Sequence, residues 1–472
     1  MSSQPSKTPR ALSALADHPI FKIIGVAAHE TNASVYAVGG FVRDFFLKRE
    51  SKDIDFVIEG DGLDFARHVA KQLRSREVAY FKKFGTAMIK HDGHQLEFVG
   101  ARRESYRGDS RKPDVEPADL FTDLARRDFT INAMAVSLNK KNYLELRDPF
   151  NGEQDLSNRL IRTPLEPAVT FSDDPLRIMR GLRFAAQLQF QIEEKTFDAM
   201  SAVKNRLQII SQERITDEFL KIVSSQKPSV GFLLMDQAGV LELIFPEFVA
   251  LKGVEGRDGF FHKDVFYHTL QVLDNISAVS DTVPLRLAAI FHDIAKPQTK
   301  AFHKGKGWSF HGHEDVGARM IPKIFRRFRL SGEWAKYVQK LTRLHLRPIA
   351  LTEEECTDSA YRRLLFQAGD ELEDLLTLCR ADITSQNEER RKRHLENFDF
   401  VVRRLEEVEA ADQMRAFQSP VRGDEIMELL EIPPGPLVGK MKKQIEEAIL
   451  DGEIPNDYNA AKAYLLNLRE KE

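Results

Sequence analysis

The stretch VGGFVRDFFLKRESKDIDFVI, residues 38–58, decides the fold of the first part of this chain. The apolar run SVYAV leads into the glycine pair Gly39-Gly40, and the aspartates Asp53 and Asp55 flank the start of the apolar run IDFVI. Paired glycines after a strand let the backbone approach a phosphate, because no Cβ stands in the way. Aspartates at i and i+2 on a strand project from one face and can jointly hold hard divalent cations. Taken alone, the glycines also fit a tight turn and the aspartates a solvated strand end.

Short runs of β-branched and aromatic residues bounded by turn residues predict further strands between residues 20 and 163, as in TAMIKHDGHQLEFVG and FTINAMAVSL. The segment FARHVAKQLRS between two of these runs has helical spacing. Glu97, in LEFVG, is a candidate third carboxylate beside the two aspartates. The charged stretch 103–123 contains two prolines and shows no clear period, which predicts a long loop.

From about Pro175 the apolar residues recur with a period near 3.6, which predicts helices from there to the end. The fold class expected is therefore α+β, with a mixed-sheet head followed by an all-α neck and a helical body. The predicted parts are a disordered tail at 1–19, the head at 20–163, the neck at 164–250, the body at 251–400 and a C-terminal helical tail at 401–472.

The composition of the 472 residues, with 42% hydrophobic and 30% charged residues, is ordinary for a soluble globular protein. No run approaches the ~18 apolar residues of a membrane span, and the polar first residues contain no secretory signal. Two cysteines, Cys356 and Cys379, exclude a disulfide scaffold and a four-cysteine zinc site. We therefore expect a cytoplasmic protein. Its net charge of -3 leaves any RNA binding to local basic patches.

Four segments together resemble the bacterial class II tRNA nucleotidyltransferase and poly(A) polymerase family. They are VGGFVRDFFLKRESKDIDFVI, LARRDFTINAMA at 124–135, LRDPFNGEQDLSNRLIRT at 146–163 and FSDDPLRIMRGLRFAAQLQF at 171–190. Their order and separation match the family as well. The resemblance implies a polymerase β-like nucleotidyltransferase head, a helical neck and attack of an RNA 3′-hydroxyl on the α-phosphate of CTP or ATP.

The resemblance also implies roles for particular residues. Asp53 and Asp55 would be the catalytic ligands of two magnesium ions, which would clamp the attacking hydroxyl and the leaving pyrophosphate. Asn132 would help to hold its segment. The nucleotide would be bound by Gly39, Gly40, Arg43, Arg127, Asp128, Asp174, Arg177, Arg180 and Arg183.

Base selection is expected from Asp174 and Arg177. A carboxylate can accept from an exocyclic amine while a planar guanidinium donates to a ring nitrogen or carbonyl, a pattern that fits cytosine and adenine. Arg180 and Arg183 follow at three-residue intervals on the same helix face, although a solvated basic stripe has the same spacing. The family usually has Glu-Asp ahead of this helix, whereas Asp173-Asp174 stands here.

Histidines in the second half have the chemistry of a transition-metal site, with an adjacent His-Asp pair on an apolar helix. The pattern resembles the HD phosphohydrolase family and implies a second divalent metal. We expect His313 rather than His311 to be a ligand. Any single member also fits a structural histidine. The candidate ligands are His268, His292, Asp293, His313, His345 and Asp382.

The segment KIFRRFRL, residues 323–330, is the densest basic and aromatic cluster outside the nucleotide site. It fits either RNA phosphate binding or a helix with its aromatic residues inside. The expected function is addition of CCA to the 3′ end of tRNA from CTP and ATP. A poly(A) polymerase, a CC-only or A-only enzyme, an HD phosphohydrolase and a non-catalytic RNA-binding protein are the alternatives. The sequence leaves the oligomeric state open.

Overall fold

The computed structural model describes residues 10–469, apart from 76, 82–84, 106–113, 255, 258–259, 262–263, 304–306, 353–355, 386, 417–418, 451–452 and 456. The chain divides into two compact units. The first comprises Met1–His345 with Thr377–Thr384, and the second comprises Leu346–Leu376 with Ser385–Glu472. Both candidate sites predicted from the sequence lie in the first unit.

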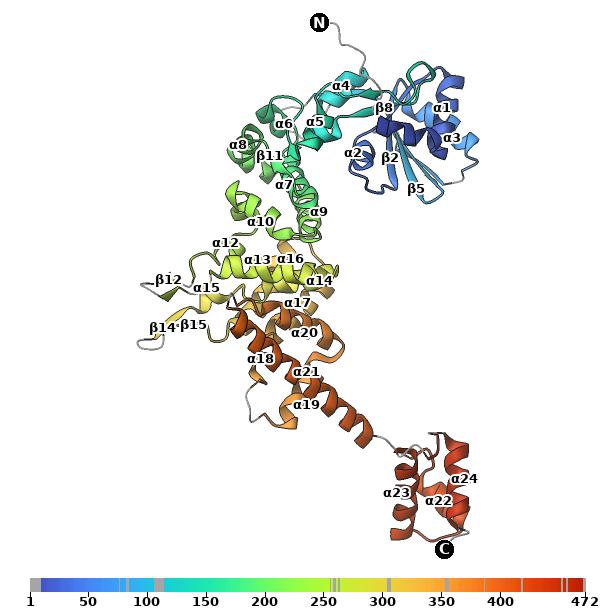
Figure 1. The fold of residues 1–472 in the computed structure, drawn as a ribbon, viewed down its shortest axis with the longest axis vertical. Coiled ribbons are helices and arrows are strands. Elements are labelled where there is room, and N and C mark those ends of the chain that lie inside the picture. Colours follow the sequence, from blue (N-terminus) through green and yellow to red (C-terminus); the bar gives the residue numbers. More distant parts are fainter. Residues whose placement is uncertain are drawn as a thin grey trace. The chain divides into compact units, whose positions relative to one another are not determined.

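A seven-stranded sheet forms the centre of the head, in the order β3-β4-β5-β2-β1-β8-β9 (Figure 1). β2 runs parallel to β5, and all other neighbouring pairs in this sheet are antiparallel. The mixed sheet that the sequence predicts is therefore confirmed. The strands are β1 (Ser34–Val38), β2 (Asp53–Glu59), β3 (Val78–Phe81), β4 (Thr86–His91), β5 (His94–Gly100), β8 (Ala135–Ser137) and β9 (Leu146–Arg147).

The alternation of side chains along β2 separates the core of the head from its site. Ile54, Phe56 and Ile58 are buried on one face, where the ring of Phe56 stacks on that of Phe98 with centroids 5.1 Å apart. Two helices, α1 (Pro19–Thr31) and α3 (Gly62–Gln72), pack on that face. Because successive side chains alternate, the carboxylate of Asp55 lies on the opposite face.

Short elements complete the head around that opposite face. They are α2 (Gly40–Phe46), β6 (Arg102–Ser105), β7 (Asp114–Pro117), α4 (Leu120–Ala125), η3 (Thr130–Asn132), η4 (Lys140–Asn142), α5 (Gly152–Ser157) and β10 (Leu160–Ile161). β6 and β7 pair as an antiparallel ribbon, so the expectation of a continuous loop at 103–123 is wrong at both ends. Its middle, 106–113, lies outside the described residues.

The beginning of the chain also differs from the prediction. Residues 10–17 form the 3₁₀ helix η1 (Arg10–Asp17), in which Leu12 and Leu15 are buried. The two leucines lie three residues apart and therefore share one face of the turn, which packs beside α1. A disordered tail over all of 1–19 is thus the wrong interpretation, and residues 1–9 lie outside the described residues.

The neck is helical apart from one short strand. It contains α6 (Pro167–Asp173), α7 (Leu176–Leu188), β11 (Gln191–Ile192), α8 (Glu194–Val203), η5 (Lys204–Ile209), α9 (Gln212–Val223), α10 (Pro228–Gln237), α11 (Val240–Ile244) and α12 (Pro246–Val249). α7 packs against both α9 and α10. β11 pairs with β10, which ties the neck to the end of the head.

A phenylalanine-rich core joins the neck to the helices that follow. The ring of Phe219 on α9 lies 5.1 Å from that of Phe328, and Phe245 lies 5.4 Å from both Phe291 and Phe328. Phe325 and Phe328 of the segment KIFRRFRL are buried. Its aromatic residues therefore face the core, as in the second of the two interpretations, while phosphate binding by its arginines stays a prediction.

The body of the first unit carries the predicted histidines. Its elements are β12 (Gly256–Arg257), β13 (Phe260–Phe261), α13 (Val265–Ser277), α14 (Val283–Phe291), α15 (Lys296–Thr299), β14 (Ala301–His303), β15 (Gly307–Ser309), α16 (His313–Arg327) and α17 (Gly332–Leu344). The end of α20 (Leu372–Asp382) completes this unit.

Arg286, a fully buried residue on α14, connects the body to the neck through hydrogen bonds. Its guanidinium donates to the carbonyls of Val223 and Ser225, at and just after the end of α9, and to those of Ser277 and Ser280, at and just after the end of α13. The last carbonyls of a helix have no partner within the helix, so one side chain here satisfies the ends of two helices.

The second unit is wholly helical in its described residues. It contains α18 (Arg347–Ala350), α19 (Asp358–Ala368), η6 (Gly369–Glu371), the start of α20, α21 (Glu388–Ala416), α22 (Gly423–Leu430), α23 (Pro436–Leu450) and α24 (Tyr458–Arg469). The boundary predicted between residues 400 and 401 falls inside α21, since this charged helix contains no stop signal there. The last three helices share an apolar core that includes Ile426, Ile445 and Leu465.

Candidate active site and candidate metal centre

The head site begins where β1 ends. Gly39 has φ of +72° and ψ of −132°, a conformation that only glycine adopts readily. A Cβ at this position would lie 2.9 Å from Nη1 of Arg127 and 3.6 Å from Oδ2 of Asp55. Gly39 therefore lets a guanidinium and a carboxylate approach the same turn, whereas a Cβ on Gly40 would meet only ordinary contacts.

Three carboxylates gather where the start of β2 lies beside the middle of β5. Asp53 is exposed and Asp55 half-buried on β2, and the register of the parallel pair places Glu97 directly opposite Asp55. Burial raises the pKa of Asp55, with Asp53 adding to the rise and Arg127 opposing it. Burial and the nearby Asp55 likewise raise the pKa of Glu97. Partly buried carboxylates that repel one another fit a shared divalent cation, because its charge would relieve both costs.

A polar cleft of about 580 Å³ adjoins these carboxylates. Among the described residues, its lining contains eight arginines but only three aspartates, and so is strongly cationic. Its lining residues are Gly39, Gly40, Arg43, Asp55, Arg102, Arg126, Arg127, Asp128, Asn132, Asp174, Arg177, Arg180, Arg183, Phe184 and Arg214. A polyanion such as a triphosphate matches this lining in charge and in hydrogen-bonding geometry.

Carboxylates and an amide hold the arginines of the head in place. Arg43 donates from Nε and Nη2 to the two oxygens of Asp44, at 2.9 and 2.8 Å, and from Nη1 to Oδ1 of Asn132 at 2.8 Å. The buried carboxylate of Asp123 pairs with both Arg126 and Arg127. These contacts leave the guanidiniums ordered before any ligand arrives.

Asp128 connects the head to the neck. Its Oδ1 accepts from the amide of Asn132 at 3.0 Å, and its Oδ2 pairs with Arg180 of α7 at 2.6 Å. Burial favours the neutral acid, but the Arg180 guanidinium and the Asn132 amide hold the pKa of Asp128 well below its usual range. In this structure the carboxylate therefore orients Arg180.

The predicted base-selecting pair lies at the start of α7. Asp174 and Arg177 both line the cleft, and Oδ2 of Asp174 lies 4.0 Å from Nη2 of Arg214. Arg177 is buried and donates to the carbonyls of Thr170 and Arg126, at 3.3 and 2.6 Å. Its guanidinium is thus fixed by backbone on one side, which defines where its remaining donors point.

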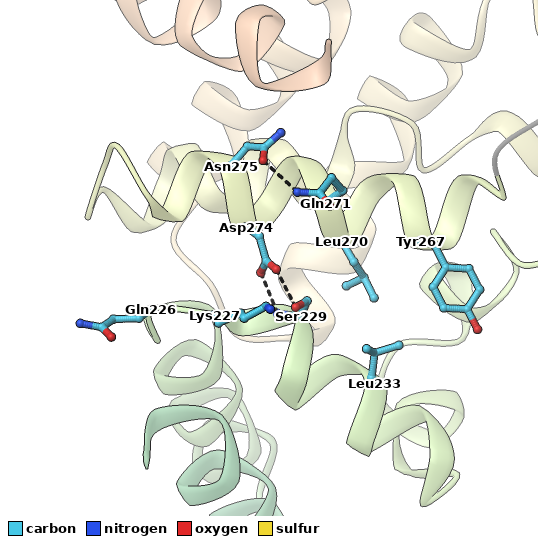
Figure 2. A pocket seen from close by; sticks show the side chains of 9 residues that line it. All are labelled: Gln226, Lys227, Ser229, Leu233, Tyr267, Leu270, Gln271, Asp274 and Asn275. Carbon is cyan, nitrogen blue, oxygen red and sulfur yellow. Dashed lines mark hydrogen bonds between the residues drawn. The ribbon is translucent and has the colours of Figure 1, made fainter. Parts of the chain in front are cut away.

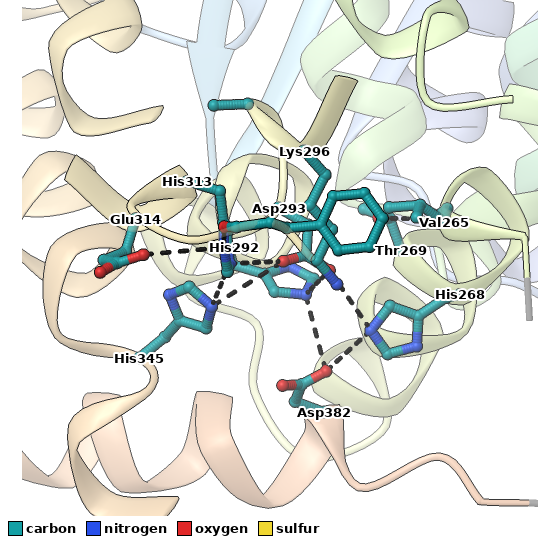
Figure 3. Close-up of polar contacts among 12 residues, drawn as sticks. Val265, His268, Thr269, His292, Asp293, Lys296, His313, Glu314, His345 and Asp382 are labelled. Atoms are coloured by element: carbon teal, nitrogen blue, oxygen red, sulfur yellow. Dashed lines mark hydrogen bonds and ion pairs between the residues drawn. The ribbon is translucent and has the colours of Figure 1, made fainter. Parts of the chain in front are cut away.

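A second cluster of titratable side chains lies in the body. The structure brings together the six predicted ligands of the body (Figure 3). They are His268 of α13, His292 and Asp293 after α14, His313 of α16, His345 after α17 and Asp382 of α20. Nε2 of His268 lies 2.8 Å from Oδ1 of Asp382. Nε2 of His313 and of His345 lie 3.1 and 3.8 Å from Oδ1 of Asp293. The predicted His313, and not the exposed His311, belongs to the cluster.

The tautomers of three of these histidines are set by the backbone. Nδ1 of His292, His313 and His345 lies 2.7–2.8 Å from the carbonyl three residues earlier, so each Nδ1 carries a proton and Nε2 is the nitrogen that would bind a metal. This arrangement is typical of imidazoles that bind a metal through Nε2.

The electrostatics of the cluster fit a cation. Burial lowers the pKa of His292, but Asp293 and Asp382 outweigh it and raise the value to about 10, so this position strongly favours positive charge. Nε2 of His292 is buried and makes no hydrogen bond of good geometry to the described residues. Four imidazoles and two carboxylates form a donor set that suits transition metals.

A separate hollow, of about 560 Å³, lies between α10 and α13 and is lined by Tyr267, Leu270 and the side-chain amides of Gln226, Gln271 and Asn275 (Figure 2). Its one carboxylate, Asp274, accepts from the amide and the hydroxyl of Ser229, at 3.0 and 2.6 Å. That carboxylate therefore holds the first turn of α10, and the hollow lacks the convergent charges of the other two sites.

Comparisons with known proteins place these two sites in context. Residues 35–162 match a family model described as the poly A polymerase head domain, 189–251 match a probable RNA and SrmB-binding site of polymerase A, and 265–415 match the HD domain. The A-adding tRNA nucleotidyltransferase of Deinococcus radiodurans is 33% identical over 426 residues, which are 88% of this chain and 92% of that relative. The chain belongs to the tRNA nucleotidyltransferase family.

Other members of this family match shorter parts. The A-adding tRNA nucleotidyltransferase of Aquifex aeolicus is 48% identical over 161 residues, covering 34% of this chain and 19% of that relative. The multifunctional CCA protein of Shewanella frigidimarina is 33% identical over 312 residues, covering 64% and 70%. The chain is thus a nucleotidyltransferase with an HD domain.

Solved structures agree with this assignment. A tRNA nucleotidyltransferase complexed with a primer tRNA and an incoming ATP analog has a TM-score of 0.59 and 26% identity, covering 80% of this chain and 99% of that one. An apo CCA-adding enzyme has a TM-score of 0.63 over 98% of both chains, but its 22% identity shows the fold alone. Within the described parts of the chain, no helix is long and apolar enough to cross a membrane.

All nine residues predicted to bind the nucleotide line the one arginine-rich cleft, together with Asp55. Their roles in this nucleotidyltransferase stay predictions. Sequence reasoning missed Arg102, Arg126 and Arg214 in the lining, and it missed Glu218, which pairs with Arg183 at 3.0 Å. Arg214 and Glu218 lie one helical turn apart on α9, a spacing that gives no hint of which distant helix they face.

Proposed function

We propose that this chain adds nucleotides from CTP and ATP to the 3′ end of tRNA, without a nucleic-acid template, and so builds its CCA end. The observation that carries the proposal is the cleft that eight arginines and Asp55 line, with Asp53 and Glu97 beside Asp55. The full-length similarity to a named tRNA nucleotidyltransferase supports tRNA as the acceptor.

The arginines would bind the triphosphate of the incoming nucleotide. Arg43 lies on α2, Arg127 follows α4 and reaches Gly39, and Arg180 comes from the neck. Because their carboxylate and amide partners already order them, little reorganisation is needed when charge develops on the leaving pyrophosphate. The acceptor's 3′-oxygen bonds to the α-phosphorus while the bond from that phosphorus to the oxygen bridging the β-phosphate breaks.

The acidic side chains would hold the metal. Asp53 and Asp55 project from one face of β2 and Glu97 stands beside them, a donor set of hard oxygen ligands that suits magnesium. Bound there, two magnesium ions would supply charge stabilisation for both the attacking and the leaving oxygen. Gly39 keeps the route between these carboxylates and Arg127 clear of side-chain atoms.

Asp174 and Arg177 would select the base. Both cytosine and adenine present an exocyclic amine next to a ring nitrogen acceptor, so one carboxylate and one guanidinium can serve both. Arg177 reaches the cleft from a position fixed by the carbonyls of Thr170 and Arg126. Substitution Asp174→Asn would keep the size of the side chain but would turn part of the acceptor into a donor.

The test is incubation of the purified chain and magnesium with tRNA transcripts that end before CCA or after CC, with CTP and ATP supplied separately and together. Sequencing of the products should show completed CCA on the shorter transcript. Asp53→Asn and Asp55→Asn should abolish extension, while Asp293→Asn in the HD cluster should leave it intact and serves as the matched acid-to-amide control. Failure of both transcripts to extend would contradict the proposal.

Addition of the terminal A alone is the second candidate product. It is favoured by the relative with the longest match described above, which is named an A-adding enzyme. The same cleft serves this reaction, since only the acceptor's length and the use of CTP differ. Extension of the CC-ended transcript by one A, with no incorporation of CTP into the shorter transcript, would select this candidate. Long adenosine tails would instead identify a poly(A) polymerase.

The HD cluster would supply a second, hydrolytic activity on phosphoesters. The three imidazoles with locked Nδ1 protons, together with Asp293 and Asp382, support a divalent transition metal. A metal held there would activate water and polarise a phosphoryl oxygen. Lys296, whose Nζ lies 2.8 Å from Oδ2 of Asp293, adds a cation beside the position a phosphate would take.

A hydrolysis assay with a 2′,3′-cyclic nucleotide, in the presence of nickel or manganese, tests this activity. Turnover should be lost in Asp293→Asn and retained in Asp53→Asn, the reverse of the pattern for nucleotide addition. Metal analysis of the wild-type chain should find more bound transition metal than in His292→Ala. Absence of turnover with each metal, together with equal metal content in the two proteins, would mean that the HD fold serves as a scaffold.

A further inference from the structure

Phe184 stands at the centre of the arginines that face the cleft. Its ring lines the cleft and is nearly buried, and it packs edge-on against Phe129 with centroids 5.9 Å apart. Three guanidinium carbons lie close to this one ring: Arg183 at 4.3 Å, Arg43 at 5.0 Å and Arg180 at 5.5 Å from its centroid. All three distances are within the roughly 6 Å over which a cation is attracted to an aromatic face.

The three arginines come from two separate parts of the fold. Arg43 belongs to α2 in the head, whereas Arg180 and Arg183 belong to α7 in the neck, which also carries Phe184. Each has its own acidic partner: Asp44, Asp128 and Glu218 respectively. The aromatic ring is thus the one group among the described residues within cation–π distance of all three arginines.

Like charges held this close repel one another, so the arrangement needs compensation. Burial lowers the pKa of Arg183 and Glu218 opposes that, while repulsion from Arg180 and Arg43 contributes to a value of about 10. Nε of Arg183 is buried and has no hydrogen-bond partner among the described residues. The negative face of an aromatic ring offers compensation without the cost of desolvating another carboxylate.

We propose that Phe184 is a positioning residue that holds Arg43, Arg180 and Arg183 as one preassembled cradle for the phosphates of the incoming nucleotide. The inference rests on the proposed role of these arginines in nucleotide binding. Phe184 acts through them, so its effect should appear in the binding of phosphates. A leucine would fill much of the same space but would offer no negative face to the guanidiniums.

The test compares three variants of the full chain. Phe184→Leu removes the ring, and Phe184→Tyr keeps the aromatic face. Phe190→Leu is the matched control: Phe190 is buried to a similar extent just after the same helix, and no arginine lies over it among the described contacts. Inorganic pyrophosphate with magnesium is the probe, because it lacks a base and so reports the phosphate cradle alone.

Phe184→Leu should weaken pyrophosphate binding about 5- to 30-fold, as expected from the loss of one or more partly desolvated cation–π contacts. The KM for ATP should rise to a similar extent with little change in kcat, because phosphate binding is shared by the ground state and the transition state. Phe184→Tyr should restore most of the affinity, and Phe190→Leu should leave it unchanged.

Three outcomes would overturn the inference. Unchanged pyrophosphate affinity in Phe184→Leu, with a raised KM for ATP, would mean that the ring stacks on the base instead. Equal losses in Phe184→Leu and Phe190→Leu would mean a general packing defect. A separate variant, Arg183→Gln, tests whether this arginine binds the phosphates of the nucleotide. If it binds pyrophosphate like the wild type, the proposed role of Arg183 is wrong, and so is the inference about Phe184 that rests on it.

Discussion

Substitution of Gly39 by alanine would place a methyl group where the structure leaves no room for one. The backbone at Gly39 has φ of +72° and ψ of −132°, which costs a non-glycine residue about 1–3 kcal/mol. The new Cβ would also lie 2.9 Å from Nη1 of Arg127, which must then move. That movement strains the ion pair between Arg127 and the buried Asp123, whose atoms are 3.2 Å apart.

The cost should appear in nucleotide addition. The displaced Arg127 would lose a charge-assisted contact with the triphosphate worth about 1.5–3 kcal/mol, which predicts a fall in kcat/KM of roughly 10- to 150-fold at about tenfold per 1.4 kcal/mol. The assay is single-nucleotide extension of a CC-ended tRNA with ATP. Gly40→Ala should lose less than Gly39→Ala, since its Cβ would come no closer than 3.7 Å to Arg43.

Gly93→Ala is the control that has the backbone strain of Gly39→Ala without the steric contact of its new Cβ. Gly93 has φ of +76° in the turn between β4 and β5, and a Cβ there would meet nothing within 4 Å. It should therefore lose about 1 kcal/mol of stability and no activity. If Gly39→Ala kept the same kcat/KM as Gly93→Ala at equal folded fraction, the argument that Gly39 admits Arg127 and Asp55 to one turn would be refuted.

Three further predictions concern charge and burial. Asp55→Asn should abolish nucleotide addition and yet raise the Tm of the metal-free chain by a few degrees, because burial disfavours the ionised carboxylate. Differential scanning fluorimetry with EDTA measures this Tm. An unchanged or lower Tm would contradict the prediction. The affinity of the head site for manganese should decrease as the pH falls from about 8 towards 5. Calorimetry on the Asp293→Asn variant measures this affinity, because that variant lacks one ligand of the HD cluster. The raised pKa values of Asp55 and Glu97 mean that protons compete with the metal at a higher pH than for exposed carboxylates; a flat profile would count against both ligands. Arg286→Met should lower the free energy of unfolding by about 3 kcal/mol in urea titrations, since two buried and two partly buried carbonyls lose their donor. A loss below about 1 kcal/mol would show that water replaces the guanidinium.

Local sequence patterns predicted the parts of the head that depend on near neighbours. Asp53 and Asp55 share a strand face because side chains alternate along β2, and Gly39 ends β1 in the positive-φ turn that paired glycines suggest. The helical period after Pro175 likewise predicted α7, with its arginines spaced by three residues. Such features follow from the geometry of one strand or one helix.

The predictions that failed depended on partners elsewhere in the chain. Residues 10–17 are ordered because Leu12 and Leu15 find a buried position beside α1. Arg102–Ser105 and Asp114–Pro117 form strands because each supplies the other's hydrogen bonds. Charge and proline content in these segments indicated their local preference but could not reveal what they would meet.

The sequence by itself determined the family, the order of the head, neck and HD parts, and the chemical type of both sites, because these depend on residue identity and short-range spacing. The tertiary structure decided what surrounds each group. The parallel register set Glu97 beside Asp55. The packing of α7 against α9 set Glu218 beside Arg183, and the approach of Arg43 from α2 completed the three arginines around Phe184. Contacts between residues tens to hundreds of positions apart arise from the packing of whole elements, and no local pattern encodes that packing.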